Sequence, residues 1–474
     1  MPSAHYERLS ALDASFLELE DENIHMHVAA TLVFDAGPLR TPQGGLDMER
    51  IRDYLAARLH IVPRYRQRLA WIPIERHPVW IDDARFNVFY HMRHTALPRP
   101  GEERQLKRLC GRILSQKLDL TKPLWEMWVV EGLQGDRFAL VAKAHHAMVD
   151  GISGFDILKV LLSATPETTF DPGPVWRPRP APSSAELVAD ELRRRSSLPL
   201  GLARAAVRAV TDPKRALSSA RDATGGLVEA LGGASTPASN TPFNPELGPH
   251  RRLDWLGISL ADVKAVKNRW GGTVNDVVLA TVVGGARRFL VGRGLRPEGL
   301  EFRAMIPVSV RADNELGYVG NKVAQLLARL PMDEPDPYAR YRRVVETTTT
   351  LKSSHQVEGS ELLKELSDWT ATAVLTEIMR FTARRRAYNV IVTNVPGPAT
   401  PLHLLGAPMR EAYPVVPLFP NQGVGIALFS YAGGLFWGIL ADWDALPDLH
   451  DLVEALRSEF DLLLRLARNG TSAA

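Results

Sequence analysis

The sequence has little of several features that would point to particular classes of protein. It contains one cysteine, Cys110, in 474 residues, which excludes an intramolecular disulfide framework and cysteine-based zinc fingers. Its charge is nearly balanced, with 57 Lys and Arg against 54 Asp and Glu, which argues against a protein built mainly to coat nucleic acid. A single cysteine fits a reducing compartment, so we expect a cytoplasmic protein.

Signatures of cofactor binding and of covalent catalysis are also missing. The sequence has no G-x-G-x-x-G run, no Walker A run and no G-x-S-x-G elbow, which are the usual local signs of nucleotide binding and of a serine nucleophile. Cys110 falls in a helical pattern with no histidine nearby. We therefore expect no metal or redox cofactor and no enzyme nucleophile.

Long apolar segments that would target or cross a membrane are likewise not expected. The N-terminal residues carry charges throughout and contain no apolar run of the kind found in signal peptides. Residues 412–441 carry no charge, a length that could span a bilayer. Prolines interrupt the first part of this stretch, and Gly433-Gly434 separates two runs rich in β-formers. The pattern favours a buried hairpin over a membrane helix.

What is present is an ordinary globular composition, 45% hydrophobic and 23% charged, in a chain long enough for two or three domains. Strand-like and helix-like segments alternate over residues 1–165 and again over 246–474. A Pro/Gly-rich, partly helical linker covers 166–245. Periodicity predicts strands at 28–34, 125–130, 138–144, 303–310, 323–330 and 389–395, and helices at 47–59, 103–118, 152–162, 185–195, 198–210, 260–269, 275–291, 337–352, 360–382 and 447–466.

The strongest local signal is His145-His146-x-x-x-Asp150-Gly151, which has a chance frequency on the order of 10⁻³ in a chain of this length. It lies where a strand ends and a helix begins, a place where α/β folds present reactive side chains. Strand alternation puts the two histidines on opposite faces, which weakens a metal site and leaves one histidine to act as a general base on a substrate hydroxyl or amine. The alternative is a structural core histidine followed by an aspartate that caps the next helix.

From this motif outward, the chain resembles the bacterial wax ester synthase/diacylglycerol acyltransferases, within the chloramphenicol-acetyltransferase-like superfamily. The resemblance extends almost from end to end, with the linker as the exception. Its motifs are residues 9–16, Pro123-Leu124-Trp125, the histidine motif, Asn275-Asp276, residues 307–311, Gly320-Asn321 and residues 393–398, where Thr393 stands at a position more often serine.

The resemblance implies an α/β (α+β) fold of two chloramphenicol-acetyltransferase-like domains, each a mixed sheet with flanking helices, and a tunnel between them. Acyl-CoA would enter this tunnel as a substrate and meet an acceptor alcohol. His146 would be the general base, with His145 and Gly151 completing the motif. Asp150 would be a structural brace, for which we take Arg311 as the partner, and wild-type activity in Arg311→Ala would refute that pairing.

The remaining motif residues have two interpretations each. Asn275 and Asp276 either begin a helix, where Asn caps and Asp favours the dipole, or place Asn275 near the tunnel as a donor or organiser. Pro123-Leu124-Trp125 is better explained as structural. Thr393 and Asn394 could also supply a donor at the tunnel.

Three functions stay open. The first is transfer of a long-chain acyl group from acyl-CoA to diacylglycerol, to a long-chain alcohol, or to both. The second is a transferase of the same fold that uses another acceptor or a carrier-protein thioester. The third is a catalytically silent protein that binds lipid or coats droplets. Leucines and arginines of 198–210 also form a weak basic amphipathic pattern, which would either rest on the inner membrane or on lipid droplets or pack against the protein itself.

Overall fold

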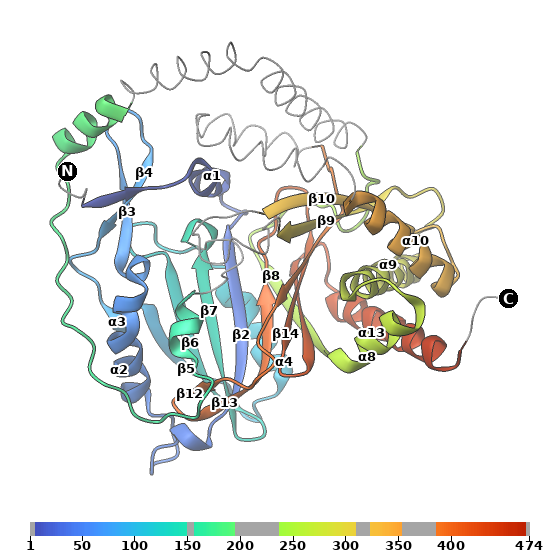
Figure 1. Ribbon diagram of the computed structural model, residues 1–474, viewed down its shortest axis with the longest axis horizontal. Helices are drawn as coiled ribbons and strands as arrows, with labels where there is room; N and C mark the ends of the chain where they lie inside the picture. The colour runs from blue at the N-terminus through green and yellow to red at the C-terminus, as the bar shows by residue number, and fades with distance from the viewer. Residues whose placement is uncertain (1–4, 149–155, 195–236, 310–322, 353–384, 471–474) are drawn as a thin grey trace, which may run out of the picture.

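A computed structural model describes residues 5–148, 156–194, 237–309, 323–352 and 385–470. Two six-stranded mixed sheets, each with helices packed against it, lie side by side in the structure (Figure 1). A three-stranded antiparallel sheet joins the N-terminal one. The predicted α/β architecture of two mixed-sheet domains is therefore confirmed.

The centre of the N-terminal sheet is a hairpin that follows directly from its sequence pattern. Strand β6 (Trp125–Leu133) and strand β7 (Arg137–His145) are almost wholly buried and antiparallel. Between them, Gly135 and Asp136 both have positive φ, as glycine and aspartate in a tight turn allow. Strand β2 (His27–Asp35) pairs along the whole other edge of β7, so β7 is a central strand.

The complete N-terminal sheet has the order β12-β13-β2-β7-β6-β5, and only its β5–β6 pair is parallel. Its further strands are β12 (His403–Leu404), β13 (Ala407–Val415) and β5 (Met92–Ala96). Its helices are α1 (Ala11–Leu19), α2 (Met48–Arg58), α3 (Val88–His91), α4 (Glu103–Leu114) and α5 (Asp156–Leu161), with short 3₁₀ turns η1 (Gly37–Leu39), η2 (Leu59–Ile61), η3 (Pro63–Arg66) and η4 (His146–Met148). The small sheet consists of β1 (Tyr6–Arg8), β4 (Pro78–Asp82) and β3 (Gln67–Trp71).

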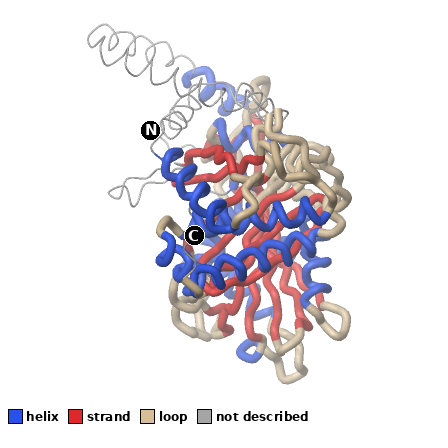
Figure 2. The backbone as a smooth tube through the Cα atoms, turned by 90° about the vertical axis from the view of Figure 1, so that its right-hand side faces the viewer, coloured by secondary structure: helices blue, strands red, loops and turns tan. Residues whose placement is uncertain are grey.

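The C-terminal sheet has the order β10-β9-β11-β14-β15-β8, with β11 parallel to both of its neighbours. Helices pack across its strands (Figure 2). The strands are β8 (Arg251–Ser259), β9 (Phe302–Ser309), β10 (Val323–Leu330), β11 (Val390–Pro396), β14 (Val424–Tyr431) and β15 (Gly434–Asp442). The helices are α8 (Leu260–Trp270), α9 (Val274–Gly292), α10 (Pro337–Lys352) and α13 (Leu449–Arg468).

The uncharged stretch near the C-terminus forms the predicted hairpin of β14 and β15. Its turn is Ala432-Gly433, both with positive φ, which is the geometry of a two-residue hairpin loop. In the described part of the chain, no helix combines the length and the apolar content that crossing a membrane requires.

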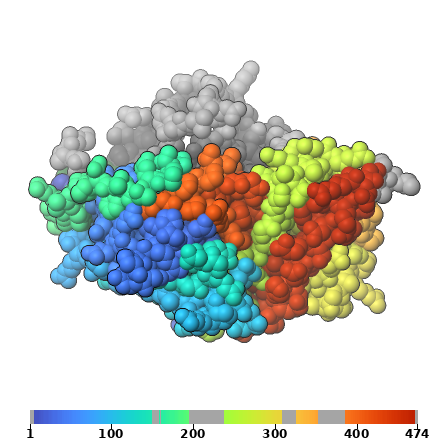
Figure 3. All heavy atoms as spheres, turned by 90° about the horizontal axis from the view of Figure 1, so that it is seen from below, coloured from blue at the N-terminus to red at the C-terminus, as the bar shows by residue number. Residues whose placement is uncertain are grey.

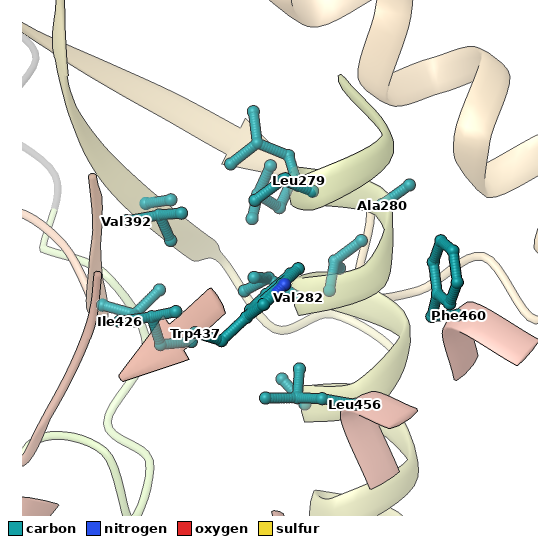
Figure 4. Close-up of a cluster of buried hydrophobic side chains, with 14 of the residues drawn as sticks. Leu279, Ala280, Val282, Val392, Ile426, Trp437, Leu456 and Phe460 are labelled. Carbon is teal, nitrogen blue, oxygen red and sulfur yellow. The ribbon is translucent and has the colours of Figure 1, made fainter. Parts of the chain in front are cut away.

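Helix α9 lies at the centre of the C-terminal core, between the sheet and α13. Its apolar side chains meet Val392, Ile426 and Trp437 of the sheet on one side and α13 on the other (Figure 4). A Cβ atom at Gly284 would lie 2.3 Å from the Glu459 side chain of α13. Glycine at this position therefore allows the two helices to approach closely.

The C-terminal part of the chain completes the N-terminal sheet, because β13 pairs with β2 while β14 and β15 stay in the other sheet. The orange-coloured segment that carries these strands lies between the two halves in Figure 3. The rings of Trp255 in β8 and Tyr413 in β13 stack across this junction at 4.8 Å. The division of the chain into domains at 166 and 246 stays a prediction. Strand β13 does not follow this division, because it lies after residue 246 but belongs to the N-terminal sheet.

The first part of the linker is docked on the N-terminal half. Arg179 makes a two-pronged ion pair with Asp82, with N–O distances of 3.0 and 2.9 Å. A helix over residues 184–194 is held by an ion pair of 2.7 Å between Glu191 and Arg8. The second helical pattern, 198–210, and the predicted helix 360–382 lie outside the described residues.

Two details of the predicted helices are wrong. The helix expected over 103–118 ends at Leu114, where the buried Lys143 ammonium donates to the carbonyls of Ile113 and Gln116 at 2.9 Å each. The helix expected to begin with a cap at Asn275 is instead capped by Thr273, whose hydroxyl accepts from the Asp276 backbone N–H.

Candidate active site

The histidine motif lies at the end of β7, as the sequence predicts. His145 is the last residue of the strand and pairs with His27, the first residue of β2. His146 begins the 3₁₀ turn η4. The two side chains therefore leave the sheet at one edge, in different backbone conformations. Asp150 and Gly151 of the motif, and Arg311, lie outside the described residues, so the Asp150–Arg311 pairing stays a prediction.

The side chain of His146 is half-buried against helix α1. Its ring centroid is 4.1 Å from that of Phe16, and its backbone N–H donates to the Met26 carbonyl at 2.7 Å. Its Nδ1 atom is buried and has no hydrogen-bond partner among the described residues. Burial, with a smaller contribution from the charge of His145, lowers the pKa of His146 to about 4. The imidazole is therefore neutral near pH 7 and able to accept a proton.

His145 is fully buried, with a backbone amide bonded to one ring nitrogen and a carboxylate near the other. Its Nδ1 accepts from the Ala147 backbone N–H at 3.0 Å, so the ring proton of a neutral His145 lies on Nε2. That Nε2 atom is 3.4 Å from Oε1 of Glu20. His145 is thus fully buried while His146 is half-buried, and the assignment of one histidine to a substrate stays a prediction.

Glu20 is a residue that the sequence reasoning missed. It is the C-cap of α1, and its side chain is only 8% exposed. Burial favours the neutral carboxyl, but the hydrogen bond and charge of His145 and the Met26 N–H outweigh that effect and hold the pKa of Glu20 below its usual value. Glu20 is thus a buried carboxylate beside the motif. In sequence it stands in an acidic run, residues 18–22, which looks like a solvated helix end.

Pro123-Leu124-Trp125 supports the backbone of the motif from the next strand. The Leu124 carbonyl accepts from the His145 backbone N–H at 2.9 Å. Trp125 is 1% exposed, its indole N–H donates to the Tyr65 carbonyl at 2.7 Å, and its ring stacks on His91. These contacts agree with the structural role that the sequence favoured for this motif.

Asn275 and Asn394, two candidates 119 positions apart in the sequence, lie in contact. The Asn394 amide nitrogen donates to the Asn275 side-chain oxygen at 2.8 Å, which joins β11 to the first turn of α9. The Asn394 side-chain oxygen is buried and has no partner among the described residues. Thr393, beside it on β11, pairs with Ala427 in the sheet.

Asp276 has a structural role at the beginning of α9. Its carboxylate accepts from the Thr273 N–H at 2.7 Å and from the Thr348 hydroxyl at 2.6 Å, and the residue is 2% exposed. This arrangement is a capping box. The helix-start interpretation is therefore sufficient for Asp276, while Asn275 next to it faces Asn394.

Cys110 has the properties of an unreactive core residue. It is fully buried, and burial raises the pKa of its thiol to about 12. A thiol in this state is not a nucleophile at neutral pH. Within the ranges that the structure describes, no group of three or more His, Cys, Asp or Glu residues is arranged to hold a metal ion.

Comparisons with known proteins give one consistent family. The model "Wax ester synthase/diacylglycerol acyltransferase catalytic domain" matches residues 9–278, and "WS/DGAT C-terminal domain" matches residues 319–464. The protein Rv1760 of Mycobacterium tuberculosis, provisionally named a diacylglycerol O-acyltransferase, is 35% identical over 468 residues, which cover 97% of this chain and 91% of that protein.

Solved structures agree on the fold. The wax ester synthase/diacylglycerol acyltransferase of Marinobacter aquaeolei VT8 is similar with a TM-score of 0.68 at 24% identity, covering 97% of this chain and 100% of that one. The first condensation domain of the calcium-dependent antibiotic synthetase is similar with a TM-score of 0.60 at 16% identity, covering 100% and 98%.

Proposed function

The chain belongs to the wax ester synthase/diacylglycerol acyltransferase family, and from this premise we propose that it transfers a long-chain acyl group from acyl-CoA to the hydroxyl of diacylglycerol, of a long-chain alcohol, or of both. The family models and the relatives that span nearly the whole chain support this assignment. The observation that carries it is the state of His146, a neutral, half-buried imidazole at the end of β7.

In the proposed reaction, His146 accepts the proton of the acceptor hydroxyl while that oxygen attacks the thioester carbonyl of acyl-CoA. A C–O bond forms and the carbonyl oxygen takes the negative charge of a tetrahedral intermediate. The C–S bond then breaks, the ester leaves, and the proton passes from His146 to the departing CoA sulfur. No acyl-enzyme is formed. A positioned general base typically contributes about 10²–10⁴-fold.

The tetrahedral intermediate needs hydrogen-bond donors for its oxyanion, which can supply roughly a further 10²–10³-fold. We assign this part to Asn275. Because its side-chain oxygen is occupied by the Asn394 amide, the Asn275 nitrogen keeps its two N–H groups for another acceptor. Asn394 would act by orienting Asn275. The tunnel that brings the substrates together stays a prediction.

The test is CoA release from palmitoyl-CoA by the purified full-length chain, with diacylglycerol, with hexadecanol, or without acceptor, followed by identification of the lipid product. Acceptor-dependent release with formation of the matching ester is the expected result, and the faster acceptor names the main product. Release without acceptor, or release without ester, would contradict transfer to a hydroxyl. Folded protein that releases no CoA would instead favour a carrier-protein donor, another acceptor or a lipid-binding role.

A further inference from the structure

We propose that Glu20 is a positioning residue, which fixes the backbone on both sides of His146 and so aims its imidazole. The inference rests on the proposed function, because it assigns a role relative to the general base. It is carried by two chains of polar contacts that both begin at one carboxylate oxygen, Oε1, and end at consecutive backbone amides, those of His146 and Ala147.

The first chain runs through Met26. The Met26 backbone N–H donates to Oε1 of Glu20 at 2.8 Å. The carbonyl of the same residue accepts from the backbone N–H of His146 at 2.7 Å. Met26 is fully buried and directly precedes β2. Both of its polar backbone groups are therefore hydrogen-bonded in these two contacts. Glu20 thus holds the segment that holds the amide of His146.

The second chain runs through His145. Oε1 of Glu20 is 3.4 Å from Nε2 of His145, and Nδ1 of His145 accepts from the Ala147 N–H at 3.0 Å. A ring that accepts at Nδ1 carries its proton on Nε2 when neutral, where it faces the carboxylate. Glu20 therefore favours the one tautomer of His145 that can hold Ala147, in the manner of an outer carboxylate that orients a histidine.

Helix α1 connects these contacts to the His146 ring itself. Phe16 lies one helical turn before Glu20 and packs against His146 with centroids 4.1 Å apart. One short helix therefore contacts the ring through Phe16 and the flanking backbone through Glu20. Displacing its end would move the imidazole, and a misplacement of about 1 Å at a reacting group can cost on the order of 10²-fold in rate.

The charge around Glu20 fits a fixed carboxylate. Nε2 of His27 lies 3.7 Å from Oε1, and the charge of Lys117 also acts on Glu20. His25 and the buried Lys143 also interact electrostatically with Glu20, and Lys143 pairs with Glu126 at 2.5 Å. Burial is the main reason that the pKa of His27 lies well below its usual value, so His27 is neutral at pH 7. The Met26 N–H and the positive charge of Lys117 help to keep this buried carboxylate ionised.

Two substitutions of nearly equal size separate positioning from charge. Glu20→Gln keeps a carbonyl oxygen that can accept from the Met26 N–H and lie near the His145 ring, while Glu20→Met keeps the volume and removes the acceptor. We expect Glu20→Met to lower kcat by about 10–10²-fold with KM for palmitoyl-CoA nearly unchanged, and Glu20→Gln to restore kcat to within a few-fold of wild type. Glu22→Met, a change at an exposed glutamate two residues further on, is the control and should match wild type.

Hydrogen exchange of the segment 144–148 gives a readout that does not need turnover. The amides of His146 and Ala147 should exchange faster in Glu20→Met, but not in Glu20→Gln, while β6 and α9 keep their protection. Should the methionine variant fail to fold, Glu20→Ala takes its place.

Wild-type kcat in Glu20→Met, equal losses in both variants, or unchanged exchange of 144–148 beside a loss of kcat would each overturn the proposal. Wild-type protein that transfers no acyl group would refute the proposed function instead. The hydrogen-exchange measurement would still show whether Glu20 stabilises residues 144–148.

Discussion

The amide nitrogen of Asn394 donates to the side-chain oxygen of Asn275 at 2.8 Å. This bond links a central strand of the C-terminal sheet to the beginning of its most buried helix. Because the Asn275 side-chain oxygen already accepts this bond, its side-chain nitrogen is the group left to donate to another acceptor. Two residues whose roles were open from sequence alone therefore form one unit in the structure.

If the two asparagines act as a unit, their substitutions will not be additive. We expect Asn275→Ala and Asn394→Ala each to lower the free energy of unfolding by about 0.5–1.5 kcal/mol. The double variant should lose clearly less than the sum, because removing the first partner already breaks the bond. Urea unfolding of the four proteins measures the coupling, and additive losses would show that the bond does not contribute.

Phe16 packs against the His146 ring, so its removal should change the proton affinity of the base. Burial lowers the pKa of His146 to about 4, and Phe16→Ala opens that environment. We expect the pKa to rise toward the unperturbed value of about 6.5. The pH dependence of kcat/KM reports it, since activity on the acid side falls as the base becomes protonated.

For Phe16→Ala, the acid limb of that profile should therefore move to higher pH. Phe89→Ala removes an aromatic ring that is 66% exposed and is the matched control, for which the wild-type profile is expected. An acid limb that stays in place in Phe16→Ala would mean that His146 is not the group that titrates.

Secondary-structure elements and hairpin turns were well predicted from the sequence. Strands β2, β6 and β7 and helices α2, α8 and α9 all lie where their apolar periodicity predicts them. The turn chemistry at Gly135 and Asp136, and the glycine at the β14–β15 turn, pointed to both hairpins. The edge of the sheet that presents the histidine pair follows from the same pattern, because each step depends only on near neighbours in the chain.

The parts that sequence reasoning missed depend on distant contacts. Strand β13 contains Pro408 and Pro414, which argue against a strand. Both stand one residue inside an end of β13, where a proline interrupts the fewest ladder hydrogen bonds. Nothing local indicates that this segment pairs with β2. The role of Glu20 was hidden for the same reason, because its partners Met26 and His145 are brought to it by the sheet.

The buried histidines should make stability depend on pH. Burial lowers the pKa of His91 to about 4, whereas the unfolded value is about 6.5. The unfolded chain therefore binds more protons between these two values, so this contribution is complete above pH 6.5 and is lost as the pH falls toward 4.

Replacing His91 removes one such contribution. His91→Gln keeps an N–H for the Trp125 carbonyl and cannot titrate. Between pH 7 and pH 5, the free energy of unfolding of wild type should fall by about 2 kcal/mol more than that of His91→Gln. Urea unfolding at both pH values measures the difference. His60→Gln, at an exposed histidine, should follow wild type, and an identical pH dependence in His91→Gln would refute the linkage.

Direct transfer predicts that no acyl group becomes attached to the protein. The Cys110 thiol is fully buried, and burial raises its pKa to about 12, so it should not react. After incubation with palmitoyl-CoA and no acceptor, the intact protein mass should be unchanged. Cys110→Ala should keep wild-type kcat apart from any loss of stability. A palmitoylated protein that transfers its acyl group when acceptor is added would replace the direct mechanism with a two-step one.

The central claim is that His146 is the general base, and its most direct test is the rate of acceptor-dependent CoA release by His146→Ala. The variant is compared with wild type and with His60→Ala, and all three are first shown to be folded by their unfolding transitions. We predict a loss of about 10²-fold or more in kcat for His146→Ala and none for His60→Ala. A folded His146→Ala protein that keeps kcat within a few-fold of wild type would contradict the account.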